Sequence, residues 1–383
     1  MTHKERILRH LAGEPVDHLP MIGGWIMGVR NLAQIGGISV EQYLADPLAG
    51  VVQANRRLRV DGMVPYIIPH ELEEMRTGSL QESHFAASEP EAVLERAEQI
   101  PASEEAVRAK HIPDYAGLEA VYREHFTSLQ AKLGDIALIP NFWQAPANFS
   151  LYFEYGYEAF LEATALYPEA LERIWWESGV ICQVHNEIIV KLIREYDSVP
   201  MLFTGHDICN NAGPMCSPAM LREYYWPHVK SGLEPYVEAG IRLIHHCDGN
   251  VMPLIDDMID AGFSGFQGFQ YECGVDPAEL RMRRSPHGEP IILLGGLSVT
   301  RTLPFGTAED VHREVDYCLD ITDGGKGFFL FTSNVTGVEV PPENIITAYD
   351  YLYNHNPQTT PPRQTTCHRP PALEIDPGMA VVR

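Results

Sequence analysis

The sequence predicts a single (β/α)₈ TIM barrel, because short apolar segments alternate with helical segments and polar residues follow the apolar ones. Eight apolar segments have strand length and lack strict alternation, as expected of parallel strands buried on both faces. These segments are residues 19–25, 62–68, 136–143, 201–208, 242–248, 265–271, 290–296 and 327–333. Strands that alternate with helices indicate right-handed βαβ units. Eight such units close into a barrel more naturally than they form an open sheet, which is the alternative.

Start signals support the intervening helices. Ser217, followed by a proline, predicts a helix N-cap, and Pro227 should kink the helix that follows. Thr307 and Asp310 have the spacing of a capping box. The last helix is expected to begin at Pro342, because proline suits the first helical turn.

The barrel is expected to occupy residues 1–356 as one domain. An insertion at about 69–135 separates the second and third strands, with one helix after Glu104 and another from Tyr115. Insertions on this side of a barrel usually shape the entrance of the site. Residues 357–383 are rich in Pro and Thr and predict an irregular C-terminal tail.

Composition excludes several classes of protein. The chain has 28 basic and 52 acidic residues, a formal net charge of −24, so nucleic acid is not an expected partner. It has no run of about 18 apolar residues to span a membrane, and its start lacks a secretory apolar stretch. Seven scattered cysteines form no C-x-x-C pair, which argues against a disulfide framework and against a closed zinc site. We therefore expect a cytoplasmic protein, and the sequence allows a homodimer as well as a monomer.

The candidate catalytic residues are Asp207, His246 and Asp248, at the ends of the fourth and fifth strands. Alternate residues of a strand share a face, so His246 and Asp248 should point together and could chelate a metal or transfer a proton. The alternative is that Asp248 only caps the turn that Asp-Gly-Asn favours. His245 and Cys247 should point the other way, the first as a hydrogen-bonded structural histidine and the second as a small buried residue.

Polar and aromatic residues at the other strand ends are candidates for substrate binding, since barrel sites form at the carboxyl ends of strands. Trp143 could form one wall of a pocket for a flat substrate, or belong to the core. The substrate-binding candidates are Trp25, His70, Trp143, Gln144, Asn211, Gln270 and Asn334; Gln267 and Glu272 lie at strand ends as well. The chain lacks the motifs of P-loop, dinucleotide-binding and α/β-hydrolase proteins.

Five segments in this order resemble the uroporphyrinogen decarboxylase superfamily, over residues 4–356. They are Lys-Glu-Arg-Ile-Leu from residue 4 with Pro-Val-Asp-His-Leu-Pro from 15, Ser-Pro-Ala-Met from 217, His-Cys-Asp-Gly-Asn from 246, Leu-Gly-Gly-Leu from 294 with the segment 303–311, and Val-Pro-Pro-Glu-Asn-Ile from 340. The fold of that superfamily is a TIM barrel, which agrees with the strand count.

Departures from the superfamily patterns favour one branch. The decarboxylases carry several arginines after the first strand, whereas this chain has Arg30 alone there. Corrinoid-dependent methyltransferases that act on thiols carry His-x-Cys on the fifth strand and a further Cys on the eighth, which hold zinc. Here Asp248 takes the first Cys position, and the eighth strand ends Phe-Thr-Ser-Asn. The chain therefore looks more like the methyltransferases that demethylate methoxylated aromatic compounds.

The resemblance implies a corrinoid-dependent O-demethylase that passes a methyl group from a methoxylated, aromatic small molecule to cob(I)alamin on a corrinoid-binding protein. Such a reaction expels a phenoxide, whose conjugate acid has a pKa of about 10, so an acid or Lewis acid must assist. Zinc held by His246 and Asp248 could assist, or a protonated His246 beside Asp248 without metal. A decarboxylase or other lyase acting on a non-porphyrin substrate, with Asp207 or His246 handling protons, is the second hypothesis. A non-catalytic corrinoid- or ligand-binding protein is the third.

Overall fold

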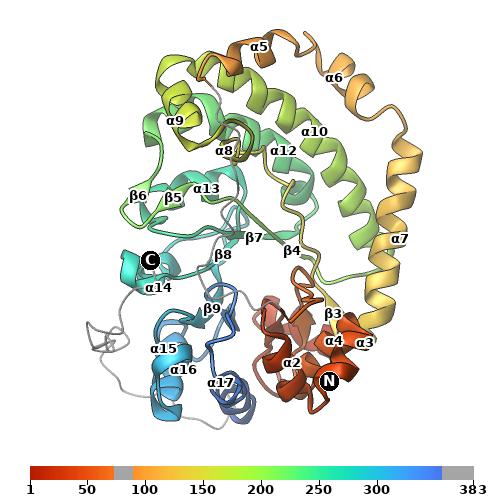
Figure 1. The fold of residues 1–383 in the computed structure, drawn as a ribbon, viewed down its shortest axis with the longest axis vertical. Coiled ribbons are helices and arrows are strands. Elements are labelled where there is room, and N and C mark those ends of the chain that lie inside the picture. Colours follow the sequence, from red (N-terminus) through yellow and green to blue (C-terminus); the bar gives the residue numbers. More distant parts are fainter. Residues whose placement is uncertain (73–88, 356–383) are drawn as a thin grey trace. The chain divides into compact units, whose positions relative to one another are not determined.

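The computed structural model describes residues 1–72 and 89–355, and these form an α/β fold with parallel strands and surrounding helices (Figure 1). The chain divides into two compact units. The described residues of unit 1 belong to the segments Met1–Ser79, Lys132–Leu138 and Ile292–Arg383. Those of unit 2 belong to Leu80–Ala131 and Ile139–Ile291.

Unit 1 contains five of the expected strands. β1 (Ile22–Gly23), β2 (Gly62–Met63) and β3 (Ala137–Leu138) pair in parallel, with Ile22 opposite Gly62 and Gly62 opposite Ala137. β9 (Ile292–Leu297) pairs in parallel with β10 (Phe328–Thr332). A parallel bridge from Met21 to Leu330 joins the two sets. The order within this unit is therefore β9-β10-β1-β2-β3.

The described residues of unit 1 form seven helices, of which four begin after a residue whose side chain caps the first turn. They are α1 (His3–Leu11), α2 (Val29–Gly36), α3 (Val40–Ala45), α4 (Pro47–Arg57), α15 (Thr302–Phe305), α16 (Ala308–Ile321) and α17 (Pro342–Asn354). The capping box of Thr307 and Asp310 is confirmed, since each side chain bonds the other's backbone N–H. The start of the last helix at Pro342 is also confirmed.

Unit 2 contains the strands that carry the candidate catalytic residues. β4 (Met201–Gly205), β7 (Arg242–His246) and β8 (Gly265–Gln267) pair in parallel. A bridge from Asn141 to Phe203 extends this set on the other side of β4. Each of the eight predicted segments therefore contains a strand or most of one, although β9 extends to Leu297. The antiparallel pair β5 (Cys209–Asn210) and β6 (Gly213–Pro214), directly after β4, was not predicted.

Helices of unit 2 pack beside these strands. Their bounds are α5 (Ala92–Glu98), α6 (Glu104–His111), α7 (Tyr115–Leu133), α8 (Tyr152–Tyr155), α9 (Tyr157–Leu166), α10 (Pro168–Glu195), α11 (Pro218–Met220), α12 (Trp226–Glu238), α13 (Ile255–Ala261) and α14 (Pro277–Arg281), with short 3₁₀ turns η2 (Met252–Leu254) and η3 (Tyr271–Cys273). The helices expected after Glu104 and from Tyr115 are confirmed. α10 and α12 run side by side (Figure 1), and the Asn186 amide donates to the Gly232 carbonyl at 2.7 Å.

The helix after Ser217 departs from the simple kink that Pro227 predicts. Ser217 is its N-cap, but the side chain makes no capping hydrogen bond. A π-helical turn, η1 (Leu221–Tyr225), lies directly before α12. Proline lacks an N–H, and its ring clashes with the carbonyl four residues earlier. A wider π turn relieves this conflict, so the helix continues past Pro227.

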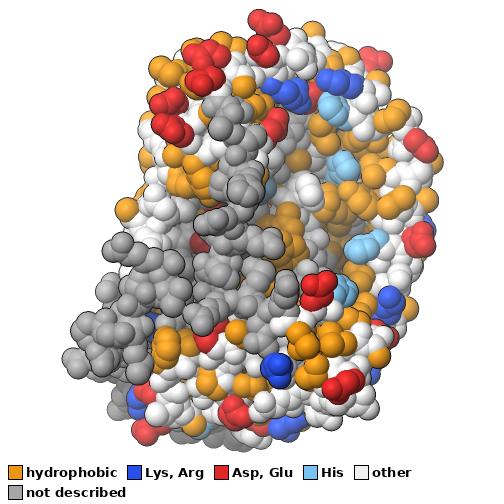
Figure 2. Space-filling view, in the orientation of Figure 1, with side chains coloured by type: hydrophobic (Ala, Val, Ile, Leu, Met, Phe, Trp, Pro, Cys, Tyr) orange, Lys and Arg blue, Asp and Glu red, His pale blue; other side chains and the backbone are white. Residues whose placement is uncertain are grey.

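The surface of the described residues carries both signs of charge. Figure 2 shows acidic side chains spread over the visible face among hydrophobic and neutral ones. Within residues 1–72 and 89–355, no helix combines the length and apolar character needed to cross a membrane. The predicted tail 357–383 lies outside the described residues, as does the part of the expected insertion at 73–88.

Candidate active site

Asp207, His246 and Asp248 lie together in unit 2. His246 is the last residue of β7, and the two aspartates lie two residues beyond the ends of β4 and β7. His246 Nε2 is 3.7 Å from Asp248 Oδ1 and 3.9 Å from Asp207 Oδ1. One ligand atom from each of the three residues lies within 4.8 Å of the other two. The strand-end argument therefore chose side chains that meet, while their chemical role stays a prediction.

The pairing of β4 with β7 brings these residues together. Gly205 stands opposite His246 in the register. A Cβ at Gly205 would lie 2.2 Å from the His246 carbonyl oxygen and 2.8 Å from its Cβ, so only glycine permits this close approach. Beyond the strands, the Asp248 backbone N–H donates to Asp207 Oδ1 at 2.9 Å. Asp207 is thus held by the loop of the neighbouring strand.

Gln267 determines which nitrogen of His246 faces the aspartates. Gln267 stands opposite His246 in the pairing of β7 with β8, and its side-chain oxygen Oε1 bonds His246 Nδ1. Both side chains are buried. An amide oxygen can only accept, so Nδ1 carries the proton and donates it. In the neutral imidazole the Nε2 lone pair then points toward both carboxylates.

This arrangement fits a bound cation. The distances of 3.7 and 3.9 Å from Nε2 to the carboxylates exceed those of a hydrogen bond. A nitrogen lone pair and two carboxylate oxygens repel one another unless a positive charge lies between them. Imidazole and carboxylate are also the ligands of catalytic zinc sites, which keep a position open for substrate. The side chains of Asp207 and Asp248 are 45% and 37% exposed, so the site is accessible.

Aromatic rings surround His246. The Trp143 ring meets the imidazole edge-on, with ring centres 6.0 Å apart and planes at 86°. The Phe203 ring lies 6.4 Å from the imidazole at 26°, and Trp143 also contacts Phe203 edge-on at 5.9 Å. Trp143 is half-buried. It therefore packs within the unit and also contacts the catalytic candidate, so the two interpretations of this residue are compatible.

His206 secures the loop that carries Trp143. The Phe149 backbone N–H donates to His206 Nδ1 at 3.5 Å, so that nitrogen is unprotonated. Burial lowers the pKa of His206 to about 4, although the Asp207 charge and a bond to the Trp143 backbone oppose the shift. His206 is therefore neutral near pH 7 and connects the end of β4 to the loop between Trp143 and Phe149.

The side chains of His245 and Cys247 are buried, and neither belongs to the cluster of Asp207, His246 and Asp248. The His245 ring packs edge-on against Phe263 with centres 4.5 Å apart, and burial holds its pKa well below the usual value. Its Nδ1 has no hydrogen-bond partner, so the prediction of a hydrogen-bonded histidine is wrong at this atom. The Cys247 thiol donates to the Asp248 carbonyl at 3.2 Å. The nearby Cys209 thiol and burial raise its pKa, which keeps it an inert thiol.

Three of the predicted substrate-binding residues lie on loops of unit 2. Gln144 is exposed one residue after Trp143. Asn211 Oδ1 accepts from the Cys273 thiol at 3.3 Å, and Gln270 Oε1 accepts from the Gly249 backbone N–H. Both amide oxygens therefore already accept hydrogen bonds from protein groups. The substrate role of these three residues remains a prediction.

The remaining candidates lie in unit 1. Trp25 is buried after β1 with φ 61, a conformation that bulky residues rarely adopt, and its ring meets Phe331 edge-on at 5.8 Å. Asn334 is half-buried after β10, and its Oδ1 accepts from the Val335 N–H at 2.6 Å. His70 is exposed. Their role in substrate binding stays a prediction as well.

Sequence reasoning assigned no role to several residues that contact the site. Gln267 was noted at a strand end, and its position opposite His246 could have indicated a partner for the imidazole. Phe203 lies one residue before the polar end of β4, and the sequence pattern there is that of an ordinary hydrophobic core residue. Tyr152, whose hydroxyl donates to the Asp207 carbonyl at 3.3 Å, follows an irregular segment that carries no usable signal.

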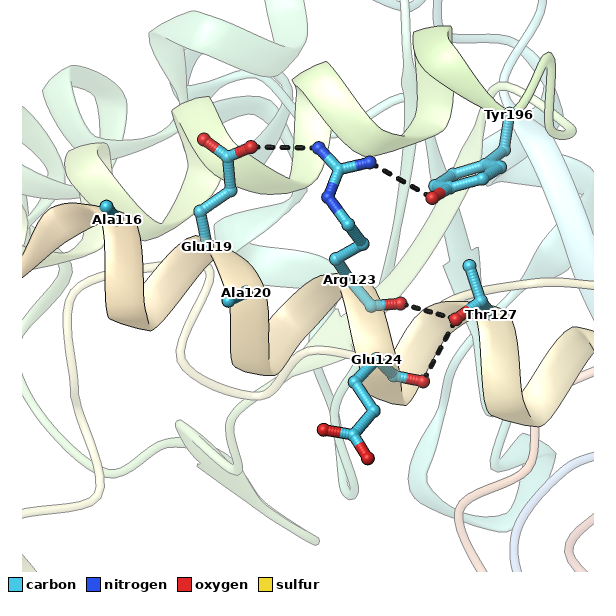
Figure 3. A pocket seen from close by; sticks show the side chains of 7 residues that line it. All are labelled: Ala116, Glu119, Ala120, Arg123, Glu124, Thr127 and Tyr196. Carbon is cyan, nitrogen blue, oxygen red and sulfur yellow. Dashed lines mark hydrogen bonds and ion pairs between the residues drawn. The ribbon is translucent and has the colours of Figure 1, made fainter.

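A shallow hollow elsewhere in unit 2 does not resemble a catalytic site. It has a volume of about 440 Å³ and lies along α7 (Figure 3). Its central cation, Arg123, is already bound to Glu119, Glu195 and the Tyr196 hydroxyl. The one basic residue that lines the hollow is therefore already paired and is not available to a ligand.

Parallel strands with ionisable side chains beyond their carboxyl ends define the class as an α/β enzyme. Residues 2–355 match the family model described as uroporphyrinogen decarboxylase (URO-D), and the chain belongs to that family. A solved structure described as a methyltransferase from Methanosarcina mazei is similar in fold, with a TM-score of 0.58 and 17% sequence identity. The match covers 92% of this chain and 98% of that one. No curated protein sequence matches the chain.

Proposed function

We propose that this protein is a methyltransferase that removes a methyl group from a methoxylated aromatic small molecule and passes it to a cob(I)alamin corrinoid. A corrinoid-binding protein is the proposed partner. The observation that carries this proposal is the cluster of Asp207, His246 and Asp248, with Gln267 bonding His246 Nδ1. Membership of the uroporphyrinogen decarboxylase family and the fold shared with a methyltransferase support it.

The chemistry of an aryl methyl ether explains why such a cluster is useful. As the methyl carbon bonds to cobalt(I), the bond from that carbon to the ether oxygen breaks, and the oxygen leaves as a phenolate. The conjugate acid of a phenolate has a pKa of about 10, so unassisted departure is slow near pH 7. A positive charge or a proton beside that oxygen lowers the barrier.

Three residues of this chain would hold a metal ion at that point. Zinc bound by His246, Asp207 and Asp248 would supply Lewis-acid stabilisation of the leaving oxygen. His246 would bind through Nε2, because Gln267 keeps the proton on Nδ1. Asp207 is held in turn by the Asp248 backbone N–H. The separation of Nε2 from both carboxylates favours a metal over the alternative in which protonated His246 acts beside Asp248.

Porphyrinogen decarboxylation is the less favoured reaction. Its substrate carries several carboxylates, which need several cationic partners. The segment between β1 and α3 contains a single arginine, Arg30, which is exposed. Among the described residues, those that contact His246 include carboxylates, an amide and aromatic rings. Such surroundings repel a polyanion and suit a neutral aromatic compound.

We also propose that the strands of both units form one (β/α)₈ barrel spanning residues 1–356, with residues 69–135 as the insertion. Family membership and the parallel pairing within each unit support this architecture.

The proposed function is tested with cob(I)alamin and 2-methoxyphenol under reducing conditions. We expect methylcobalamin to appear by its absorbance, together with an equal amount of catechol, and no carbon dioxide. Treatment with a chelator should abolish the reaction, and added zinc should restore it. Zinc content is measured alongside, and we expect one ion per chain.

Two outcomes contradict the proposed methyl transfer, and a third contradicts the proposed metal. Release of carbon dioxide from carboxylated aromatic compounds, without methylcobalamin, would indicate the lyase alternative. Tight binding of 2-methoxyphenol without either product would indicate a ligand-binding protein. Full activity in a metal-free preparation would reject the metal and leave protonated His246 as the acid.

A further inference from the structure

Two tyrosine rings stack beside Asp207. The rings of Tyr152 and Tyr157 are nearly parallel, with centres 4.4 Å apart and planes at 9°. Tyr152 is 2% exposed, and its hydroxyl donates to the Asp207 backbone carbonyl at 3.3 Å. The inner ring of the stack is therefore fixed to the segment that carries a candidate metal ligand.

The outer ring is open to solvent. Tyr157 is 40% exposed, although its large ring would be more stable if buried. Gly156, with φ 85 and ψ 155, separates α8 from α9 and lets the chain turn so that Tyr157 returns onto Tyr152. Tyr152 stacks on one face of the Tyr157 ring, and the 40% exposure of Tyr157 leaves part of the side chain accessible to a flat ligand.

The Tyr157 hydroxyl stays protonated. Burial raises its pKa above the usual value, and the Asp207 charge raises it further. Tyr157 is therefore an exposed aromatic residue stacked on Tyr152, whose own hydroxyl bonds the Asp207 carbonyl.

We propose that Tyr157 forms a binding subsite for the aromatic ring of the substrate, which stacks on its exposed face while the methoxy group points toward Asp207, His246 and Asp248. This inference rests on the proposed function and adds the residue that selects an aromatic over an aliphatic methyl ether. Offset stacking between aromatic rings is favourable beyond the apolar area that it buries.

Two probes distinguish the contribution of the aromatic ring to binding from that of the methoxy group. 2-Methoxyphenol has an aromatic ring, and 2-methoxyethanol carries the same two functional groups without one. Their affinities are measured by calorimetry on the purified, zinc-loaded protein without corrinoid. Tyr157→Leu keeps apolar bulk but removes the ring, and Tyr157→Phe keeps the ring. Leu166→Ala is the matched control, because Leu166 is 58% exposed on the same helix.

We expect Tyr157→Leu to weaken 2-methoxyphenol binding about three- to tenfold, and Tyr157→Phe to weaken it less than about twofold. Binding of 2-methoxyethanol should be weak and equal in all variants. Thermal unfolding is recorded for each variant to verify that it is folded. An unchanged affinity in folded Tyr157→Leu would overturn the inference. So would an equal loss in Leu166→Ala, or a wild-type protein that does not bind 2-methoxyphenol.

Methyl transfer is measured separately, so that the two proposals can fail independently. Binding that depends on the Tyr157 ring, without formation of methylcobalamin, supports the aromatic subsite and contradicts the methyltransferase function. If Tyr157→Leu catalyses methyl transfer with the same kcat/KM as the wild type, the proposed subsite is wrong and the proposed function is retained.

Discussion

His245 and His246 are consecutive residues of β7 and face opposite ways. His246 bonds Gln267 through Nδ1 and approaches two carboxylates through Nε2. His245 packs against Phe263, and its Nδ1 has no partner. Both side chains are buried, so burial does not distinguish them. The difference lies in what each face of the strand meets: polar groups beyond the strand ends on one side, hydrophobic packing on the other.

This contrast shows how one strand can place one histidine in a candidate site and the next histidine in hydrophobic packing. A two-residue repeat sends neighbouring side chains to opposite faces. Burial keeps His245 neutral, because the charged form loses its hydration and gains no compensating bond. His246 instead bonds Gln267 through Nδ1 and directs Nε2 toward two carboxylates. Four substitutions test this contrast, from the largest expected effect to the smallest.

Asp248→Asn should have the largest effect. It removes the negative charge and keeps nearly the same shape, so methyl transfer should fall by at least about two orders of magnitude. Affinity for 2-methoxyphenol should change far less, because the charge is needed as the bond breaks. Steady-state kinetics, calorimetry and thermal unfolding measure the three quantities. Asparagine caps turns as well as aspartate does, so normal turnover in the folded variant would favour the turn-cap interpretation.

Gln267→Leu should reduce zinc affinity or turnover about tenfold to a hundredfold. The variant removes the acceptor that holds the proton on His246 Nδ1, and loss of such a partner to a metal-ligating histidine typically costs that much. Gln267→Glu is the control, because it restores an acceptor at the same position. Competition with a chromogenic zinc chelator reports the affinity. Equal zinc affinity in all three proteins would show that Gln267 does not orient His246.

Trp143→Ala should weaken 2-methoxyphenol binding about three- to tenfold, through loss of the aromatic wall beside His246. Because the ring also contacts Phe203, unfolding temperature is measured in parallel. Phe153→Ala, at a residue 60% exposed on α8, controls for general loss of aromatic surface. If affinity and turnover were both unchanged in Trp143→Ala, the ring would belong to the core alone.

His245→Leu should have the smallest effect on activity. It exchanges a buried side chain for one of similar volume, so the free energy of unfolding should change by less than about 1.5 kcal/mol. Methyl transfer should stay within about twofold of wild type, since a residue away from the reacting groups contributes little to rate. The same change one residue later, His246→Leu, should abolish turnover. Similar losses in both variants would remove the distinction between the two faces of β7.

The sequence by itself determined the eight strand segments and the starts of several helices, but not the β5–β6 pair or the π-helical turn η1. The eight apolar segments, the capping box at Thr307 and the helix start at Pro342 are local features, and the structure contains each of them. Side chains alternate between the two faces of a strand, and polar residues at strand ends are candidates for a site. These two rules were enough to choose Asp207, His246 and Asp248. Such features depend on residues close in the chain, which is why they can be predicted.

Only the tertiary structure decided which atoms face one another. The register of Gly205, His246 and Gln267 across three strands determines the protonated nitrogen of His246. The anchoring of the Tyr152 hydroxyl to the Asp207 carbonyl joins two residues that are 55 positions apart in the chain. The missing bond at His245 Nδ1 depends in the same way on what packs against it. These contacts follow from strand register and side-chain packing between distant segments, which no local pattern encodes.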